Sequence, residues 1–167
     1  TAAPDRGVEP AVPAGASAGY RATWVSVVAN PLFALTKIVE APGVHAPYLA
    51  ARALGAIGPP ARPAVPALIK LLAGGNASAR GRAAEALGNL GPEVAPEAIE
   101  PLTAAVKDPA SPVRVQAILA VGKFGDAGKT ALPALQENMR NERSAERAQA
   151  ALSVWRLTND TTEVLPL

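Results

Sequence analysis

The stretch ARALGAIG (residues 51–58) returns twice along the chain, as AAEALGNLG (83–91) and as ILAVGKFG (118–125). The three copies place Gly55, Gly88 and Gly122 in one column, and Trp155 takes the same position in a weaker fourth copy, SVWRLT (153–158). Successive members of this column are 33, 34 and 33 residues apart. A fixed period over four copies is typical of a stacked repeat array.

Each repeat contains two helical patterns. The first pattern has apolar residues at positions i, i+3 and i+4, as in Leu68, Leu71 and Leu72, and this spacing predicts one buried stripe along a helix. The same pattern in the first repeat consists of Leu35, Ile38 and Val39.

The second pattern has small or apolar residues at spacings of four and three, which predicts a second inward stripe. Its members are Ala50, Leu54, Ile57, Ala83, Leu87, Leu90, Ala117, Val121, Phe124, Ala150, Val154 and Leu157. A glycine follows each of the first three copies, at Gly58, Gly91 and Gly125, where the chain can leave the helix with a positive φ. Strand-type alternation is absent, so we expect an all-α protein, an α-solenoid of about four helix pairs.

The repeats define the expected organisation of the chain. We expect four units over residues 31–58, 62–91, 96–125 and 128–158, and a partial fifth unit over 161–167. Residues 20–30 resemble a degenerate half repeat or cap, and the Pro/Ala/Gly-rich residues 1–19 are typical of an extended arm or linker. Because the ends of a solenoid expose apolar faces, we expect a partner protein to cover the arm and the open C-terminal repeat.

Composition excludes several classes of site. The chain has 167 residues and no cysteine, which excludes disulfides, thiolate metal sites and cysteine nucleophiles. No segment approaches the roughly 20 apolar residues that a transmembrane helix needs. The compartment stays open, although a Pro/Ala-rich start without methionine is typical of an exported, processed chain, and we favour an exported or periplasmic protein over a cytoplasmic one.

The repeat columns distinguish between repeat families. The ankyrin Thr-Pro-Leu-His stretch and the tetratricopeptide Trp-Leu-Gly-Tyr pattern are missing. The ALG-(I/L)-G helix end and the Asp108 to Arg114 pair in DPASPVR resemble the short HEAT-like repeats of the phycobilisome-lyase type. Asn141 and Arg147 repeat the spacing of that pair, whereas Gly74 stands in the Asp position before Arg80. The resemblance implies that Asp108, Arg114, Asn141 and Arg147 are structural ties between turns.

The second helix of each repeat carries a candidate partner-binding face. Counted from the glycine column, positions −6, −3 and +1 lie within about 60° of one another on a helix, and we call them the second-helix strip. Its polar members are Arg52, Arg82, Glu85, Asn89, Gln116, Lys123, Gln149 and Arg156, and its apolar members are Leu49, Ala56, Leu119 and Leu152. Trp155 beside the strip, and Trp24, are candidate contact anchors because tryptophan is enriched at binding hot spots; packing of Trp155 against the next turn is the alternative. A solvated helix face is the alternative interpretation of the strip.

Groups for catalysis are scarce in this sequence. His45 is the sole histidine, the carboxylates are scattered, and we expect no metal, no cofactor and no enzymatic activity. The repeats favour a non-catalytic scaffold or accessory subunit that binds a protein partner. Nucleic acid is disfavoured, because few cations and no aromatic platforms occupy the strip. The resemblance leaves a second function open, a lyase-type protein that handles a bilin chromophore with a partner chain and uses Arg82, Lys123 and Arg156 on its propionates.

Overall fold

The computed structural model describes residues 31–40, 45–140 and 144–160, and within them the chain forms α-helices α2 to α9, three 3₁₀ helices and no strand. The first helices of the repeats are α2 (Pro31–Val39), α4 (Val65–Gly74), α6 (Ala95–Ala105) and α8 (Leu132–Met139). The second helices are α3 (His45–Ile57), α5 (Ala77–Asn89), α7 (Ser111–Val121) and α9 (Ser144–Thr158). The 3₁₀ helices η1 (Pro59–Ala64), η2 (Pro92–Val94) and η3 (Gly125–Ala131) connect each second helix to the next first helix.

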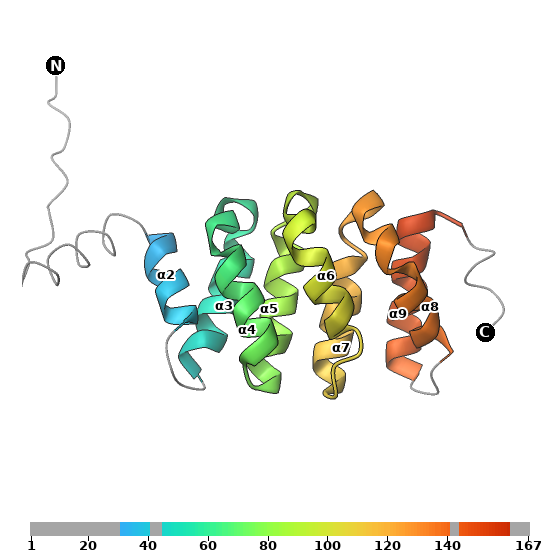
Figure 1. Cartoon of the computed structure of the whole chain (residues 1–167), viewed down its shortest axis with the longest axis horizontal. Helices are drawn as coiled ribbons and strands as arrows, with labels where there is room; N and C mark the ends of the chain where they lie inside the picture. Colours follow the sequence, from blue (N-terminus) through green and yellow to red (C-terminus); the bar gives the residue numbers. More distant parts are fainter. Residues whose placement is uncertain (1–30, 41–44, 141–143, 161–167) are drawn as a thin grey trace, which may run out of the picture.

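The four helix pairs follow one another along the long axis of the molecule (Figure 1). This arrangement confirms the predicted α-solenoid of four helix pairs. The expected arm over 1–19, the cap over 20–30 and the partial unit over 161–167 lie outside the described residues.

Local sequence signals fix where several helices begin and end. Proline occupies the first turn of α4, α6, α7 and α8, where its missing N–H costs no intrahelical bond. The side chain of Asn76 caps α5 by accepting a hydrogen bond of 2.9 Å from the backbone N–H of Ala79. As predicted, the chain leaves α3, α5 and α7 through glycines with positive φ: +72° at Gly58, +90° at Gly91 and +56° at Gly125.

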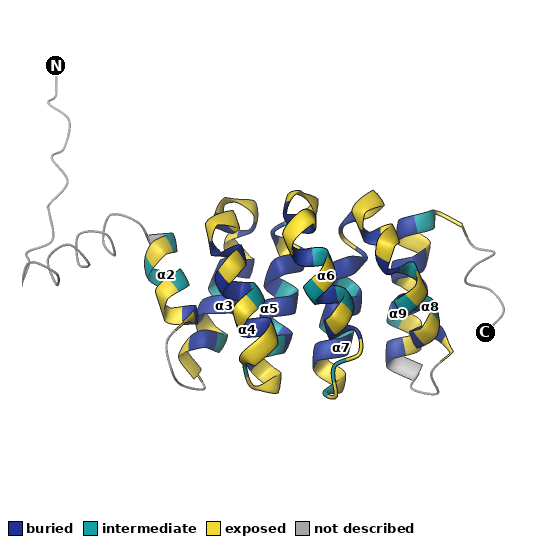
Figure 2. Ribbon diagram, in the orientation of Figure 1, coloured by how far each residue is buried: buried dark blue, intermediate teal, exposed yellow. Residues whose placement is uncertain are grey.

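The buried residues lie between the first and second helices, and Figure 2 shows them as a continuous band along the array. The second-pattern stripe is buried as predicted throughout α5 and α9 and in the third repeat, where Phe124 is 1% exposed. Two residues of the first repeat were predicted wrongly, because Ile38 and Ile57 are each 40% exposed. The pair α2–α3 is the first in the described chain and has a described neighbour on one side only, so its apolar positions are covered less completely.

The glycine column is the place where the second helices approach most closely. A Cβ atom added to Gly55 would lie 3.0 Å from the Cα of Ala86, and one added to Gly88 would lie 2.7 Å from the Cα of Ala120. At Gly122 the added atom would lie 2.6 Å from the hydroxyl oxygen of Ser153. Real Cβ atoms essentially never approach other atoms as closely as at Gly88 and Gly122, and at Gly55 the neighbour would have to shift by a few tenths of an ångström. The second helices therefore pack closely at this column, with the backbone of each glycine against Ala86, Ala120 or Ser153 of the next second helix.

We predict that Gly88→Ala lowers the free energy of unfolding by about 1–3 kcal/mol, because the new methyl group overpacks the contact with Ala120. Urea unfolding followed by circular dichroism measures the effect. The matched control is Gly74→Ala, since nothing lies within 4 Å of its added Cβ and alanine favours the helix by up to ~1 kcal/mol. Equal stability of the two variants would contradict the close approach.

Candidate functional site

The second-helix strip lies at the surface of α3, α5, α7 and α9. Arg52, Asn89, Lys123 and Arg156 are exposed, whereas Arg82, Glu85, Gln116 and Gln149 are partly buried. Among the apolar members, Leu49 is 56% exposed and Leu152 is 36% exposed. The strip thus combines polar groups that reach the solvent with accessible apolar side chains.

Arg82 lies at the centre of the strip. Its Nη1 donates a hydrogen bond of 2.6 Å to Oε2 of Glu85, and its guanidinium lies 5.0 Å from the centroid of the Tyr48 ring. The hydrogen bond to Glu85, with a smaller contribution from Tyr48, raises the pKa of Arg82 above its ordinary value. Tyr48 was not predicted as a site residue, although it stands four residues before Arg52 on the same helix and therefore on the same face.

Two adjoining hollows flank Arg82 and Glu85. One, of about 330 Å³, lies between α3 and α5 and is lined by Arg52, Gly55, Asn89 and their neighbours. The other, of about 370 Å³, lies between α5 and α7 and is lined by Tyr48, Gln116 and small or polar residues near the helix starts. Both hollows include Arg82 and Glu85, so these two side chains form a ridge between them.

A second contact joins the strip across helices. The Nζ of Lys123, just beyond α7, donates a hydrogen bond of 2.6 Å to Oδ1 of Asn89 on α5. Together with the hollows, this contact brings six of the predicted residues into one neighbourhood: Arg52, Arg82, Glu85, Asn89, Gln116 and Lys123.

The three candidates on α9 are not joined to that neighbourhood by a hydrogen bond or ion pair in the described chain. Gln149 is partly buried, Arg156 is exposed, and Trp155 is 43% exposed. α9 packs directly on α7, so these residues extend the second-helix side toward the C-terminal end of the array. Trp24, the other candidate anchor, lies outside the described residues.

A larger hollow, of about 720 Å³, lies on the opposite side of the array between α6 and α8. Its lining includes Ile99, Ala104 and Pro133, and Lys107 pairs across it with Glu137 at 2.6 Å. This hollow is mainly apolar, and its one cation is already paired. It contains none of the predicted site residues, so its size does not make it the better candidate.

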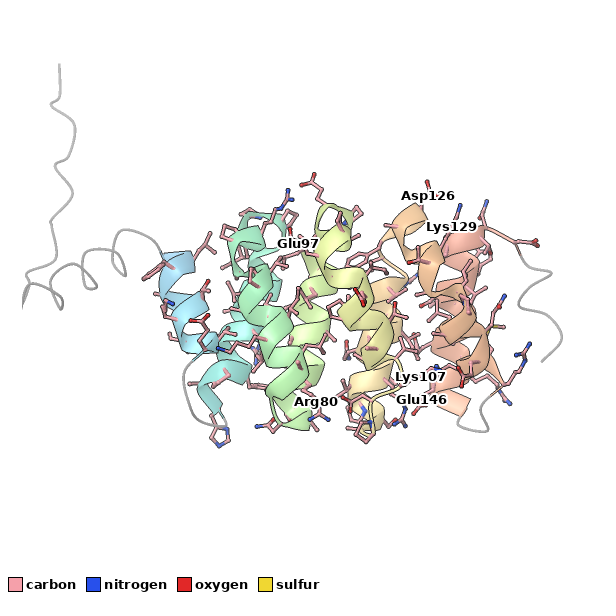
Figure 3. All side chains as sticks on the ribbon, viewed as in Figure 1. Arg80, Glu97, Lys107, Asp126, Lys129 and Glu146 are labelled. Carbon is pink, nitrogen blue, oxygen red and sulfur yellow. The ribbon has the colours of Figure 1, made fainter. Side chains whose placement is uncertain are left out.

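The prediction that the side chains of Asp108 and Arg114 pair with each other is wrong, because each pairs with another residue. The carboxylate of Asp108 accepts two hydrogen bonds of 2.8 Å from Arg80, which belongs to the preceding repeat. Arg114 donates to both carboxylate oxygens of Glu146 in the following repeat, at 3.0 and 2.6 Å. Its one direct contact with Asp108 is a 2.6 Å hydrogen bond to the backbone carbonyl. Figure 3 shows Arg80 and Glu146 at the same edge of the array.

The two arginines follow one rule, in which each ties its repeat to the next one. Arg80 and Arg114 each bond a carboxylate of the next repeat, whether their own repeat has Gly74 or Asp108 in the Asp position, and Arg80 also donates to the carbonyl of Gly75 at 2.9 Å. In the following repeat the Asp position holds the neutral Asn141, so the carboxylate comes from Glu146. Asn141 itself lies outside the described residues, and Arg147 is exposed on α9.

Catalytic and metal-binding groups are scattered over the part of the chain that the structure describes. His45 is exposed at the start of α3. Within these residues, His, Asp and Glu side chains nowhere gather in threes that could hold a metal ion. None of the described helices combines the length and apolar character needed to cross a membrane.

Comparisons with known proteins agree with this architecture. The family model described as HEAT repeats matches residues 65–155, and the one described as PBS lyase HEAT-like repeat matches residues 47–74. A crystal structure of an engineered protein superposes with a TM-score of 0.68 at 20% identity, over 81% of this chain and 67% of that one. At this identity the likeness concerns the fold alone. Among curated proteins, none matches the chain significantly.

We predict that Arg114→Ala lowers the free energy of unfolding by about 3–5 kcal/mol, because it removes two charge-assisted hydrogen bonds from the buried carboxylate of Glu146. The side chains of Arg114 and Glu146 are 8% and 1% exposed. Lys107→Ala is the control, since the Lys107–Glu137 pair is 59% and 65% exposed, and its loss costs about 0–1 kcal/mol. Similar losses in both variants would show that burial does not strengthen the Arg114 pair.

We also predict an acid-dependent contribution from Asp108. The hydrogen bonds from Arg80 hold the pKa of Asp108 below its usual value of 3.8, so the folded state binds this proton less readily than the unfolded state does. The stabilisation is therefore complete above pH 3.8 and is lost as the pH falls through the lower, folded-state pKa. The free energy of unfolding of wild type and of Asp108→Asn, measured across acid pH, should differ less and less below this pH. A difference that stays constant would contradict the pairing of Asp108 with Arg80.

Proposed function

The chain belongs to the HEAT-repeat family, and from this premise we propose that it is a non-catalytic protein-interaction module, a scaffold or accessory subunit of a larger assembly. Its partner lies on the second-helix strip. The observation that carries the proposal is the gathering of six strip residues at two adjoining hollows. Five of them line the hollows, and Lys123 is hydrogen-bonded to one of the five, Asn89. Solenoids present such extended surfaces to their partners.

Exposed apolar side chains support a protein partner. Leu49 on α3 and Leu152 on α9 lie on the strip, and Trp155 lies beside Leu152. A half-exposed indole provides a large contact area with little loss of conformational entropy when it is buried. We propose that Trp155 anchors the C-terminal end of the interface and that the same partner covers the arm over residues 1–19 and the end of the array.

The ionisable groups support a non-catalytic role. The strongly buried carboxylate, Glu146, is matched by Arg114, and ion pairing lowers the pKa of Asp108 and of Asp126. A general acid that works near neutral pH needs a carboxyl pKa that is raised, not lowered. These carboxylates therefore have the properties of structural ion pairs.

The bilin-handling alternative has weaker support. It requires Arg82, Lys123 and Arg156 to hold the propionates of the chromophore. One of these cations, Arg82, is already paired with a carboxylate within the chain, that of Glu85. An absorption spectrum of the chain mixed with a bilin tests this alternative, and tight binding with transfer to a cysteine acceptor would favour it over the scaffold.

We predict that Leu49→Ala with Trp155→Ala abolishes recovery of the native partner, because both changes remove apolar contact area from the second-helix side. The measurement is affinity purification of the tagged chain from its source, followed by quantitative mass spectrometry and the mass of the intact assembly. The control, Phe33→Ala with Ile38→Ala, removes apolar groups of similar exposure from α2. Recovery of the same proteins with both variants, or a strictly monomeric native chain, would contradict the proposal.

A further inference from the structure

We infer that the hollow between α3 and α5 receives a carboxylate from an acidic segment of the partner protein, held by Arg52 and Asn89. This inference rests on the proposed function, because it names the chemistry of the partner that lies on the strip. The hollow of about 330 Å³ has the backbone contact between Gly55 and Ala86 as its floor. Its rim carries the polar side chains that would meet the incoming group.

The orientation of the Asn89 amide follows from Lys123. A lysine ammonium has hydrogens to donate and no lone pair to accept with, so the amide oxygen of Asn89 must point toward Lys123, 2.6 Å away. The amide nitrogen therefore points away from Lys123, and its two N–H groups have no acceptor within the described residues. Asn89 lines the hollow, so an acceptor that enters it lies within reach of this amide.

Arg52 supplies the charge at the opposite wall. Its side chain is exposed, and in the ranges 31–40, 45–140 and 144–160 no carboxylate lies within ion-pair distance of it. A guanidinium presents paired N–H donors that match the two oxygens of a carboxylate. Arg52 and Asn89 thus offer charged and neutral donors from two neighbouring helices to one acceptor.

The balance of charge around the hollow favours an anion. Glu85 is the one strip carboxylate in the described chain, and Arg82 already neutralises it at 2.6 Å. Lys123 hydrogen-bonds a neutral amide and therefore keeps its full charge. Two cations, Arg52 and Lys123, remain uncompensated, and this excess attracts acidic segments and repels basic ones.

The neighbouring side chains favour a peptide over a nucleic acid. Leu49 lies three residues from Arg52 on α3 and is 56% exposed, so the complementary segment carries an apolar residue near its acidic one. A single strand of nucleic acid needs aromatic faces for its bases to stack on. Close to this hollow the aromatic ring is that of Tyr48, and the guanidinium of Arg82 already covers it.

The test measures binding of the full chain to a short fluorescent peptide of Glu and Leu, and to a matched peptide with Lys in place of every Glu. Fluorescence anisotropy should show binding of the Glu peptide alone, weakening as salt is added. Arg52→Ala with Lys123→Ala should weaken this binding by roughly ten-fold or more, as expected for lost charge-assisted hydrogen bonds. The control, Lys70→Ala with Arg140→Ala, removes the same charge from exposed positions off the strip and should leave binding unchanged.

Three results would overturn the inference: equal binding of both peptides, equal weakening by the strip and control variants, or tighter Arg52-dependent binding of a single-stranded oligonucleotide. Recovery of the native partner with each variant distinguishes failure of this inference from failure of the proposed function. If that partner is lost with Leu49→Ala and Trp155→Ala but retained with Arg52→Ala and Lys123→Ala, the docking surface stands and its preference for carboxylates is wrong. If it is retained with both variants, the docking surface is wrong as well.

Discussion

The contact between second helices at the glycine column is the constraint on which the rest of the structure depends. Each glycine lets the next second helix approach to a distance at which an added Cβ would crowd it. The three contacts are Gly55 with Ala86, Gly88 with Ala120, and Gly122 with Ser153. Because α3, α5, α7 and α9 stack this closely, their outward residues form one surface. The first helices contact one another far less, and the large hollow between α6 and α8 lies on their side.

The fourth member of the column is a tryptophan and not a glycine. Trp155 occupies the position at which the three preceding repeats have glycine, and its indole is 43% exposed. Trp155 therefore lacks the small size that lets the three glycines sit against the next second helix. The same side chain that interrupts the regular stacking provides a large apolar group beside Leu152. One substitution in the repeat thus changes a packing position into a candidate contact position.

The fold could be predicted from the sequence because each helix signal recurs in every repeat. The glycine column and the buried stripe of the second helices recur at fixed spacing, so the helices and their inward faces could be predicted. The ion pairs could not, since Arg80 and Arg114 both bond carboxylates about one repeat away. One signal was present: Glu146 stands in the column of Ala79 and Val113, both fully buried, and a buried carboxylate requires a cation. The shape of the hollows depends on which neighbours the side chains contact; Arg82, for example, contacts Tyr48 and Glu85. The pattern of residue types along the chain does not determine these contacts.

The strip follows from this stacking, so the most direct measurement is of the stacking itself. Nuclear Overhauser effects in solution report proton pairs in close contact, and the Hα protons of Gly88 should give intense cross-peaks to the methyl group of Ala120. Equivalent cross-peaks should connect Gly55 with Ala86 and Gly122 with Ser153. Observation of all three would establish the stacked second helices that the second-helix strip requires. Their absence in a folded, fully helical protein would contradict the close approach and with it the continuous surface.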